Sequence, residues 1–306
     1  MDDEIGRRAQ SWLSLARTTA RIESTVLHAD ELLMESKSRA FPALRLIRNS
    51  AHLAPLTGGF GWVRDEPDDR DHRFVAPLEI LRDLPRSVDL RPRLPPAYNQ
   101  LQINSCTANA IAAALEFDEI RQGVSKPLTP SRLFIYYNER AMEGSVGKDG
   151  GARIRDGIKA ISKQGDCPEE LWPYYKRNLN ARPPRECYSR ARHYKAVEYQ
   201  RMTHKIEELK SCLASGYPFV FGFKVFESFQ EEGIKKTGHL DMPKRPEKFI
   251  GLHAVLAVGY EDSKRWFISR NSWGDKWGMQ GYFTMPYEYL TSPELAHDFW
   301  TIRVVR

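Results

Sequence analysis

The sequence predicts an α+β protein built from a helical half and a strand-rich half. Apolar residues recur at helical spacing in several runs between residues 106 and 163, whereas strand-like runs crowd the region beyond about residue 195. Helices and antiparallel strands that are segregated in this way are typical of a two-lobed α+β protein. A chain of 306 residues is long enough for two lobes and an extension.

The composition excludes several classes of function. Apolar residues make up 41% of the chain and charged residues 28%, which is typical of a globular protein. The net charge is +6, but Lys and Arg are interleaved with Asp and Glu, which favours a solvated surface over a nucleic-acid interface. No apolar run approaches the roughly 18 residues that a membrane helix needs. We therefore expect neither a membrane nor a nucleic acid as partner.

Residues 1–83 are predicted to form an N-terminal extension, helical at first and then extended. The chain begins with acidic residues and has no continuous apolar core there, unlike a secretory signal peptide. We expect a cytoplasmic protein, one exported without a standard leader, or a sequence that lacks its leader. Within the extension, residues 57–77 are rich in Gly, Pro and Asp, with isolated aromatics at Phe60, Trp62 and Phe74. This segment is either a tethered linker or a chain that lies across the rest of the protein.

The compact domain is expected from about residue 84. A short strand is predicted from residue 87 to 90, and Thr129 with Pro130 is predicted to cap and begin the second helix. The predicted helices span residues 106–123, 131–142, 153–163 and 203–214. The predicted strands span residues 218–226, 253–260, 265–270, 281–285 and 299–305.

Cys106 stands at the start of the first of these helices. Apolar residues follow Ala108 at i+3, i+4 and i+7, the pattern of a helix buried along one face, and Asn104 or Ser105 can cap its first turn. The helix dipole favours an anion there, so we expect the thiol to ionise at a lower pH than usual. The alternative is a buried Cys that packs as a small hydrophobe.

Three further residues have the chemistry that a Cys nucleophile needs. His253 begins the strand-like run HAVLAVGY and could act as the base. Asn271 follows the run RWFISR, and its amide oxygen could fix the imidazole tautomer. Gln100, six residues before Cys106, could donate an amide N–H to a developing oxyanion.

Together these residues resemble the papain-like cysteine proteases. The most specific motif is RNSWGDKWGMQGYF, in which residues 271–274 and the second Trp-Gly pair at 277–278 match the family. The order Cys, His, Asn and the separations also fit. The segments SCTANA, GWVRDEPDDRDHRF and DFWTIRVV are similar to the bacterial, xylellain-like branch, and the resemblance runs from about residue 58 to the C-terminus.

The resemblance implies a two-lobed papain-like fold over residues 84–306, with the active site in the cleft between the lobes. The helical lobe would span about residues 96–190, and the antiparallel, barrel-like β lobe about residues 195–306. The implied activity is hydrolysis of peptide or protein substrates through a thioester intermediate, with neither a cofactor nor a metal ion.

Position by position, the resemblance assigns roles to the candidate residues. Cys106 matches the nucleophile, His253 the general base and acid, and Asn271 the residue that orients the imidazole. Gln100 matches the oxyanion donor, together with the backbone N–H of Cys106.

The resemblance also implies substrate-binding residues. Trp273 matches the indole that covers the His–Asn hydrogen bond, and Trp277 an aromatic wall on the leaving-group side. Gly150 and Gly151 fit a turn whose exposed backbone pairs with an extended substrate, because a Cβ would block the approach. Asp298 could shape the far end of a substrate pocket.

Three positions depart from the family pattern. Leu101 and Asn104 stand where the family usually has glycine, and Ile103 where secreted relatives carry a disulfide Cys. Asn tolerates a left-handed backbone, so the change at 104 is expected to be harmless, whereas Leu101 could narrow the cleft mouth. The missing Cys makes a reducing compartment more plausible.

The other cysteines leave one pairing open. A bridge between Cys167 and Cys187 would close a loop of about 20 residues, worth about 3 kcal/mol in the chain-entropy model. The alternative is two reduced thiols. Cys212 lies in a helical run and is expected to pack in the core.

The leading hypothesis is a cysteine peptidase inhibited by its own residues 58–80 lying in the cleft, with Trp62 and Phe74 as anchors. A catalytically silent binding protein of the same fold is an alternative, supported by Leu101. Another is an acyl transferase or ligase, in which an amine intercepts the thioester.

Overall fold

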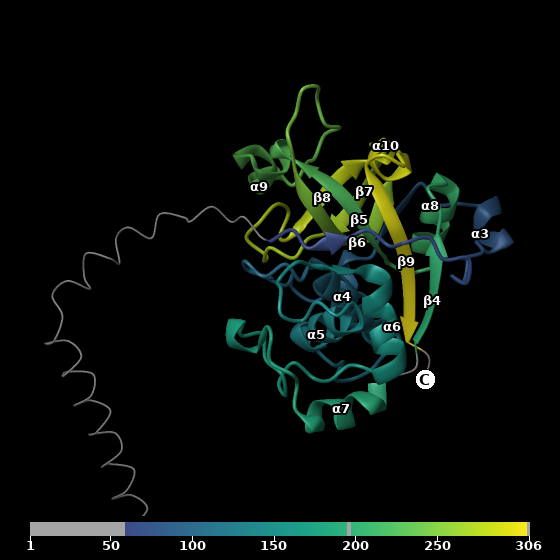
Figure 1. The fold of residues 1–306 in the computed structure, drawn as a ribbon. Helices are drawn as coiled ribbons and strands as arrows, with labels where there is room; N and C mark the ends of the chain where they lie inside the picture. Colours follow the sequence, from purple (N-terminus) through teal and green to yellow (C-terminus); the bar gives the residue numbers. More distant parts are fainter. Residues whose placement is uncertain (1–58, 195–196, 305–306) are drawn as a thin grey trace, which may run out of the picture. The chain divides into compact units, whose positions relative to one another are not determined.

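The computed structural model describes residues 59–194 and 197–304, which belong to a compact unit running from Leu56 to Arg306 (Figure 1). The helices predicted before residue 48 lie outside the described residues. The predicted boundary between residues 83 and 84 falls within the compact unit and stays a prediction.

The helices gather mainly in the first half of the described chain, as the sequence predicts. They are α3 (Leu78–Arg82), α4 (Cys106–Arg121), α5 (Arg132–Met142), α6 (Ile154–Gln164), α7 (Arg185–Ala191), α8 (Ile206–Ala214), α9 (Glu232–Thr237) and α10 (Tyr287–Thr291). Short 3-10 turns are η1 (Arg91–Arg93), η2 (Lys176–Asn178), η3 (Arg192–Tyr194) and η4 (Glu227–Gln230).

The strands of the second half form one large antiparallel sheet. They are β4 (Val197–Met202), β5 (Phe219–Phe226), β6 (Phe249–Glu261), β7 (Trp266–Arg270), β8 (Tyr282–Pro286) and β9 (Ala296–Val304). Their order in the sheet is β4-β9-β5-β6-β7-β8, and β2 (Ser87–Asp89) pairs with β6. A separate parallel pair joins β1 (Trp62–Val63) to β3 (Ala152–Arg153). Figure 1 shows α4, α5, α6 and α7 on one side and the large sheet on the other, which is the predicted two-lobed α+β architecture.

Helix α4 is the centre of the fold and differs from its predicted form. It packs against β5, β6 and β9 of the sheet as well as against α5 and α6. The side chains from Cys106 to Glu119 are therefore buried all round rather than along one face. Because both lobes meet on this helix, its first residue lies where the lobes join.

The start of α5 also differs from the prediction. Ser131 is the N-cap, and its hydroxyl accepts the backbone N–H of Phe134 at 3.2 Å. Thr129 instead donates its hydroxyl to Glu116, and Pro130 precedes the cap. Helix α5 consequently begins at Arg132.

Two strand predictions were too short, and the short pair β1 and β3 and one strand of the large sheet were missed. Strand β6 begins at Phe249, before His253, and β9 begins at Ala296 rather than at residue 299. Strand β4 was not predicted, because it is an edge strand with the mixed sequence VEYQRM. In the part of the chain described here, none of the helices has the length and apolarity needed to cross a membrane.

Candidate active site

Cys106 is the first residue of α4 and is completely buried. Its sulfur accepts the backbone N–H of Ala254 at 3.3 Å, which joins the helical lobe to β6 beside His253. The backbone N–H of Gly61 also acts on the sulfur, since it lowers the pKa of the thiol. Ser105 occupies the N-cap position, but its hydroxyl bonds to Tyr174 rather than capping the helix.

His253 on β6 and Asn271, the residue that follows β7, form a buried pair. His253 Nε2 lies 2.8 Å from Asn271 Oδ1, which also accepts the backbone N–H of Ser272 at 2.8 Å. Because Oδ1 accepts, Nε2 must carry the proton, and Nδ1 is then the basic nitrogen. Among the described residues, Nδ1 has no hydrogen-bond partner. The geometry therefore leaves a basic nitrogen free to take a proton.

Trp273 covers this pair. Its indole lies 5.3 Å from the His253 ring at an interplanar angle of 33°, and the side chain is buried. An apolar cover of this kind keeps water from competing for the hydrogen bond between His253 and Asn271.

Both the oxygen and the nitrogen of the Gln100 amide form hydrogen bonds. Its Oε1 accepts the hydroxyl of Ser272, and its Nε2 donates to the carbonyl of Ile103 at 2.8 Å. Nε2 also donates to the carbonyl of Gly59 at 3.0 Å. The carbonyl oxygen of Gly59 therefore lies where the Gln100 amide could donate to a negatively charged oxygen.

Burial keeps the thiol and the imidazole neutral in this state. Removal from water raises the pKa of Cys106 to about 12, although hydrogen bonds from the backbone N–H groups of Ala254 and Gly61 lower it. Burial also lowers the pKa of His253 to about 4. The expectation of an acidic thiol at the helix start is therefore wrong for the covered protein, because desolvation outweighs the helix dipole.

Residues 59–74, called the strap below, cover these groups. Phe60 contacts His253 edge-on at 5.9 Å and Trp273 at 6.0 Å. The next residues pair in parallel with β3, where the carbonyl of Gly61 accepts the backbone N–H of Ala152 at 2.8 Å. The strap backbone therefore crosses directly over Cys106.

The two predicted anchors lie in different places. Trp62 is buried and donates its indole N–H to Asp298 at 3.1 Å. Phe74 is also buried, but its backbone N–H bonds to the carbonyl of Arg201 on β4, at the edge of the sheet. Trp62 thus anchors the part of the strap at the nucleophile, and Phe74 a more distant part.

The strap is tied to the body by charged groups as well. Asp71 accepts Arg155 at 2.6 Å and Arg201 at 2.8 Å. Asp65 accepts the indole N–H of Trp300 at 2.9 Å. These groups are partly or fully buried, so their pairing holds the strap more firmly than surface ion pairs would.

Of the two glycines predicted to face a substrate, only Gly151 meets an extended chain. A Cβ on Gly151 would lie 2.1 Å from the carbonyl oxygen of Gly61, and its φ is +87°. Gly150 has nothing within 4 Å of an added Cβ. The close approach therefore requires glycine at 151 and not at 150.

The prediction that Trp277 forms a wall of the substrate site is not matched by its position. Trp277 is fully buried and packs against Trp273, Phe229 and Phe283. It supports Trp273 from behind, because the second Trp-Gly pair folds back into the β lobe.

The two departures from the family's glycines behave differently from expectation. Leu101 has a φ of +54°, the left-handed conformation, whereas Asn104 does not. The backbone N–H of Leu101 bonds to the side chain of Asn99 at 2.9 Å. Leu101 is 57% exposed, so it lies at the surface beside Gln100.

Cys167 and Cys187 are free thiols, so the bridge is absent in this structure. Both are buried in a small apolar cluster with Phe134 and Ala191. Burial raises the pKa of both thiols. They therefore pack as small hydrophobic groups, as Cys212 does.

Sequence reasoning missed one residue at the site and the role of another. Phe60 was named only as one of the isolated aromatics of the extended segment, and its contact with His253 was not predicted. The hydroxyl of Tyr174 bonds to Ser105 Oγ at 2.6 Å and donates to the carbonyl of Gln100 at 3.0 Å. No local pattern marks Tyr174, because it meets the site through tertiary contacts.

A buried thiol beside an imidazole held by an amide, at the junction of a helical and a β lobe, is the arrangement of a cysteine peptidase. A sequence profile described as papain family cysteine protease matches residues 84–298, and the chain belongs to this family. It is a papain-like cysteine peptidase of the xylellain-like kind and acts on peptide or protein substrates.

Individual relatives agree with this assignment. A peptidase C1-like protein of Acanthamoeba polyphaga mimivirus is 42% identical over 274 residues, which cover 82% of this chain and 88% of the relative. The crystal structure of xylellain, a cysteine protease from Xylella fastidiosa, is 45% identical and has a TM-score of 0.78, covering 81% of this chain and 97% of that one. Digestive procathepsin L 3 of Tenebrio molitor, at 19% identity and a TM-score of 0.62, covers 82% of this chain and 77% of its own and shares the fold.

Proposed function

We propose that this peptidase cleaves peptide bonds by covalent catalysis at Cys106. His253 Nδ1 takes the thiol proton, and the thiolate attacks the substrate carbonyl carbon. The single observation that carries this proposal is the pairing of His253 Nε2 with Asn271 Oδ1, which leaves Nδ1 basic and next to the residue that contacts the sulfur.

The proposed oxyanion donors are the Gln100 amide and the backbone N–H of Cys106. The tetrahedral intermediate collapses when the imidazolium protonates the leaving amine, which leaves a thioester on Cys106. Water, activated by His253, then hydrolyses the thioester and regenerates the thiol. The hydrogen bond from Gln100 Nε2 to the Gly59 carbonyl supports this assignment, because the amide already donates to a carbonyl oxygen of the strap.

We also propose that residues 58–80 inhibit the peptidase from within the cleft. Residue 58 lies outside the described residues, and the argument rests on the strap. The supporting contacts are Gly59 on Gln100, Gly61 on Cys106 and Phe60 on His253. A chain in this position blocks access to the sulfur and keeps the thiol and imidazole neutral.

The test uses the full-length chain with the strap displaced by Gly61→Ala, since deletion of residues 1–80 would also remove the buried Trp62, Asp71 and Phe74. In this opened variant, Cys106→Ala should abolish peptide hydrolysis. Asn271→Ala should lower kcat roughly 100-fold while the thiol still alkylates, because the imidazole loses its orientation. Full activity of Cys106→Ala would refute the assignment, and ligated products with added amines would instead reveal acyl transfer.

A further inference from the structure

Trp62 of the strap fills a side-chain pocket beside the candidate nucleophile. The indole is 3% exposed and lies against Gly222 of β5. A Cβ on Gly222 would come within 2.1 to 2.5 Å of three atoms of the indole ring. The missing side chain at 222 therefore makes the space that a flat, bicyclic group occupies.

Asp298 forms the far end of this pocket. Its Oδ2 accepts the indole N–H of Trp62 at 3.1 Å and the backbone N–H of Asp65 at 2.8 Å. Its carboxylate is buried, and its φ is +57°, a left-handed conformation that is uncommon for residues other than glycine. Both donors belong to the strap, so Oδ2 loses them when the strap leaves, which is unfavourable unless other donors replace them.

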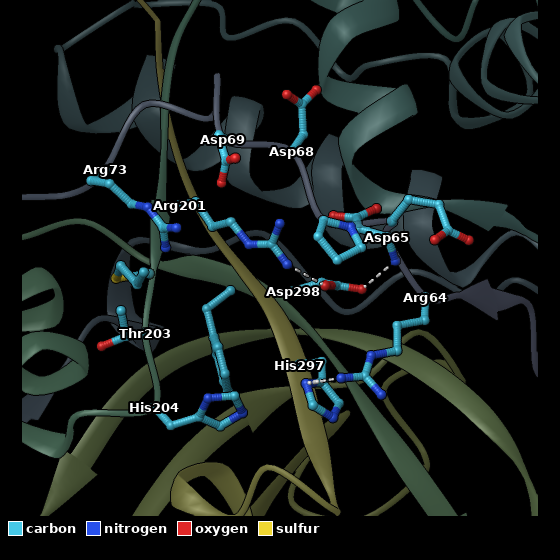
Figure 2. A pocket seen from close by; sticks show the side chains of 14 residues that line it. Arg64, Asp65, Asp68, Asp69, Arg73, Arg201, Thr203, His204, His297 and Asp298 are labelled. Atoms are coloured by element: carbon cyan, nitrogen blue, oxygen red, sulfur yellow. Dashed lines mark hydrogen bonds and ion pairs between the residues drawn. The ribbon is translucent and has the colours of Figure 1, made fainter.

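The group that takes the place of the Trp62 indole is expected to be a neutral hydrogen-bond donor rather than a cation. Figure 2 shows Arg201 bonded to Asp298 Oδ1, at 2.9 Å, so the carboxylate already has its opposite charge. Asp298 also lines a cavity of about 520 Å³, to which the body outside the strap contributes Arg201, His204 and His297 as its other titratable side chains. The remaining acidic side chains of that cavity belong to the strap. Once Trp62 has left, Asp298 therefore needs a hydrogen-bond donor but not a further positive charge.

We infer that the Trp62 pocket is a specificity pocket that selects a tryptophan side chain in the substrate. Gly222 admits the width of the indole, and Asp298 accepts its N–H. Gly151, next to the pocket, accepts an extended backbone, as its contact with Gly61 illustrates. This inference rests on the proposed function, because the pocket becomes available to a substrate only when the strap leaves.

The first test compares two peptide side chains of the same shape. The opened variant Gly61→Ala is assayed with fluorogenic peptides that carry Trp, 3-benzothienylalanine, Phe, Leu or Arg at each of the two residues on the acyl side of the cleaved bond. Benzothienylalanine matches the indole in size but has no N–H. At one of the two positions, kcat/KM for Trp should exceed that for benzothienylalanine about 10-fold, the effect of a hydrogen bond to a charged group.

The second test changes the pocket instead of the substrate. Gly222→Ala, added to the opened variant, should lower kcat/KM for the Trp peptide at least 10-fold and change the Leu peptide less than 3-fold, because only the wider side chain meets the new methyl group. Thermal unfolding verifies that the variant is folded.

The outcomes separate this inference from the proposed function. Equal rates for Trp and benzothienylalanine, or an Arg peptide as the best substrate, would overturn the tryptophan pocket while the peptidase mechanism stands. A Gly222→Ala variant that loses Leu and Trp peptides equally would also overturn it. An opened variant that cleaves none of the peptides would contradict the proposed function itself.

Discussion

The substitution Gly61→Ala tests whether the strap controls access to Cys106. A Cβ on Gly61 would lie 1.7 Å from the carbonyl oxygen of Asn104 and 2.9 Å from its Cα. Real Cβ atoms essentially never come closer than 3.0 Å to other heavy atoms, so the backbone at 61 must move by more than 1 Å. Because Asn104 lies in the turn just before α4, the strap rather than the body is expected to yield.

The size of the effect follows from this overlap. Overpacking costs about 1 to 3 kcal/mol, and a clash with a backbone oxygen belongs at the upper end. About 3 kcal/mol shifts the docking equilibrium of the strap roughly 100-fold toward the open form. We therefore expect peptidase activity of the full-length chain to rise roughly 100-fold in Gly61→Ala.

The assay is the initial rate of peptide hydrolysis under reducing conditions. Gly147→Ala is the matched control, because an added Cβ there has nothing within 4 Å and should change the rate less than twofold. If Gly61→Ala is folded by thermal unfolding and shows wild-type activity, the strap is not an inhibitor. The same conclusion follows if Gly147→Ala activates equally.

Three further predictions concern the site. In the wild type, the pKa of about 12 at Cys106 means that little thiolate exists at neutral pH. The rate of iodoacetamide alkylation should therefore rise tenfold per pH unit up to pH 10, whereas the rate in Gly61→Ala should level off at a lower pH. A wild-type plateau below pH 9 would contradict this prediction. In the opened variant, Tyr174→Phe should lower kcat about fivefold through loss of a hydrogen bond worth about 1 kcal/mol, with alkylation of the thiol unchanged; an equal loss of alkylation would mean general misfolding. Ellman's reagent should titrate no thiol in the native wild type, one in Gly61→Ala and four after unfolding, and only two after unfolding would indicate a Cys167–Cys187 bridge.

Local sequence patterns predict the elements that bear the site but not their surroundings. The start of α4 at Cys106 follows from an Ala-rich run after a polar turn. The strand that carries His253 and the strand that ends just before Asn271 follow from apolar runs. That α4 is buried on every side depends on contacts with both lobes, which no pattern within the helix reveals. Strand β4 was missed because its residues pair with β9 at an edge, where polar residues are tolerated.

The pKa of Cys106 could not be predicted from the sequence either. The helix dipole at Cys106 is a local effect and predicts an acidic thiol, but burial under the strap has the larger and opposite effect on its pKa. The burial in turn depends on Phe60 and Gly61, more than 40 residues away in the sequence. Likewise, the left-handed backbone of Leu101 reflects the turn that Asn99 stabilises, not the intrinsic preference of leucine.

Labelling with an epoxysuccinyl thiol-protease inhibitor tests the central claim most directly, that a peptidase nucleophile at Cys106 is covered by the strap. Intact mass and peptide mapping would be compared between the wild-type chain and Gly61→Ala after the same exposure. We predict one adduct per chain in Gly61→Ala, located on Cys106, and labelling of the wild type slower by roughly 100-fold. Equal labelling of both proteins, or an adduct on Cys167, Cys187 or Cys212, would contradict the account.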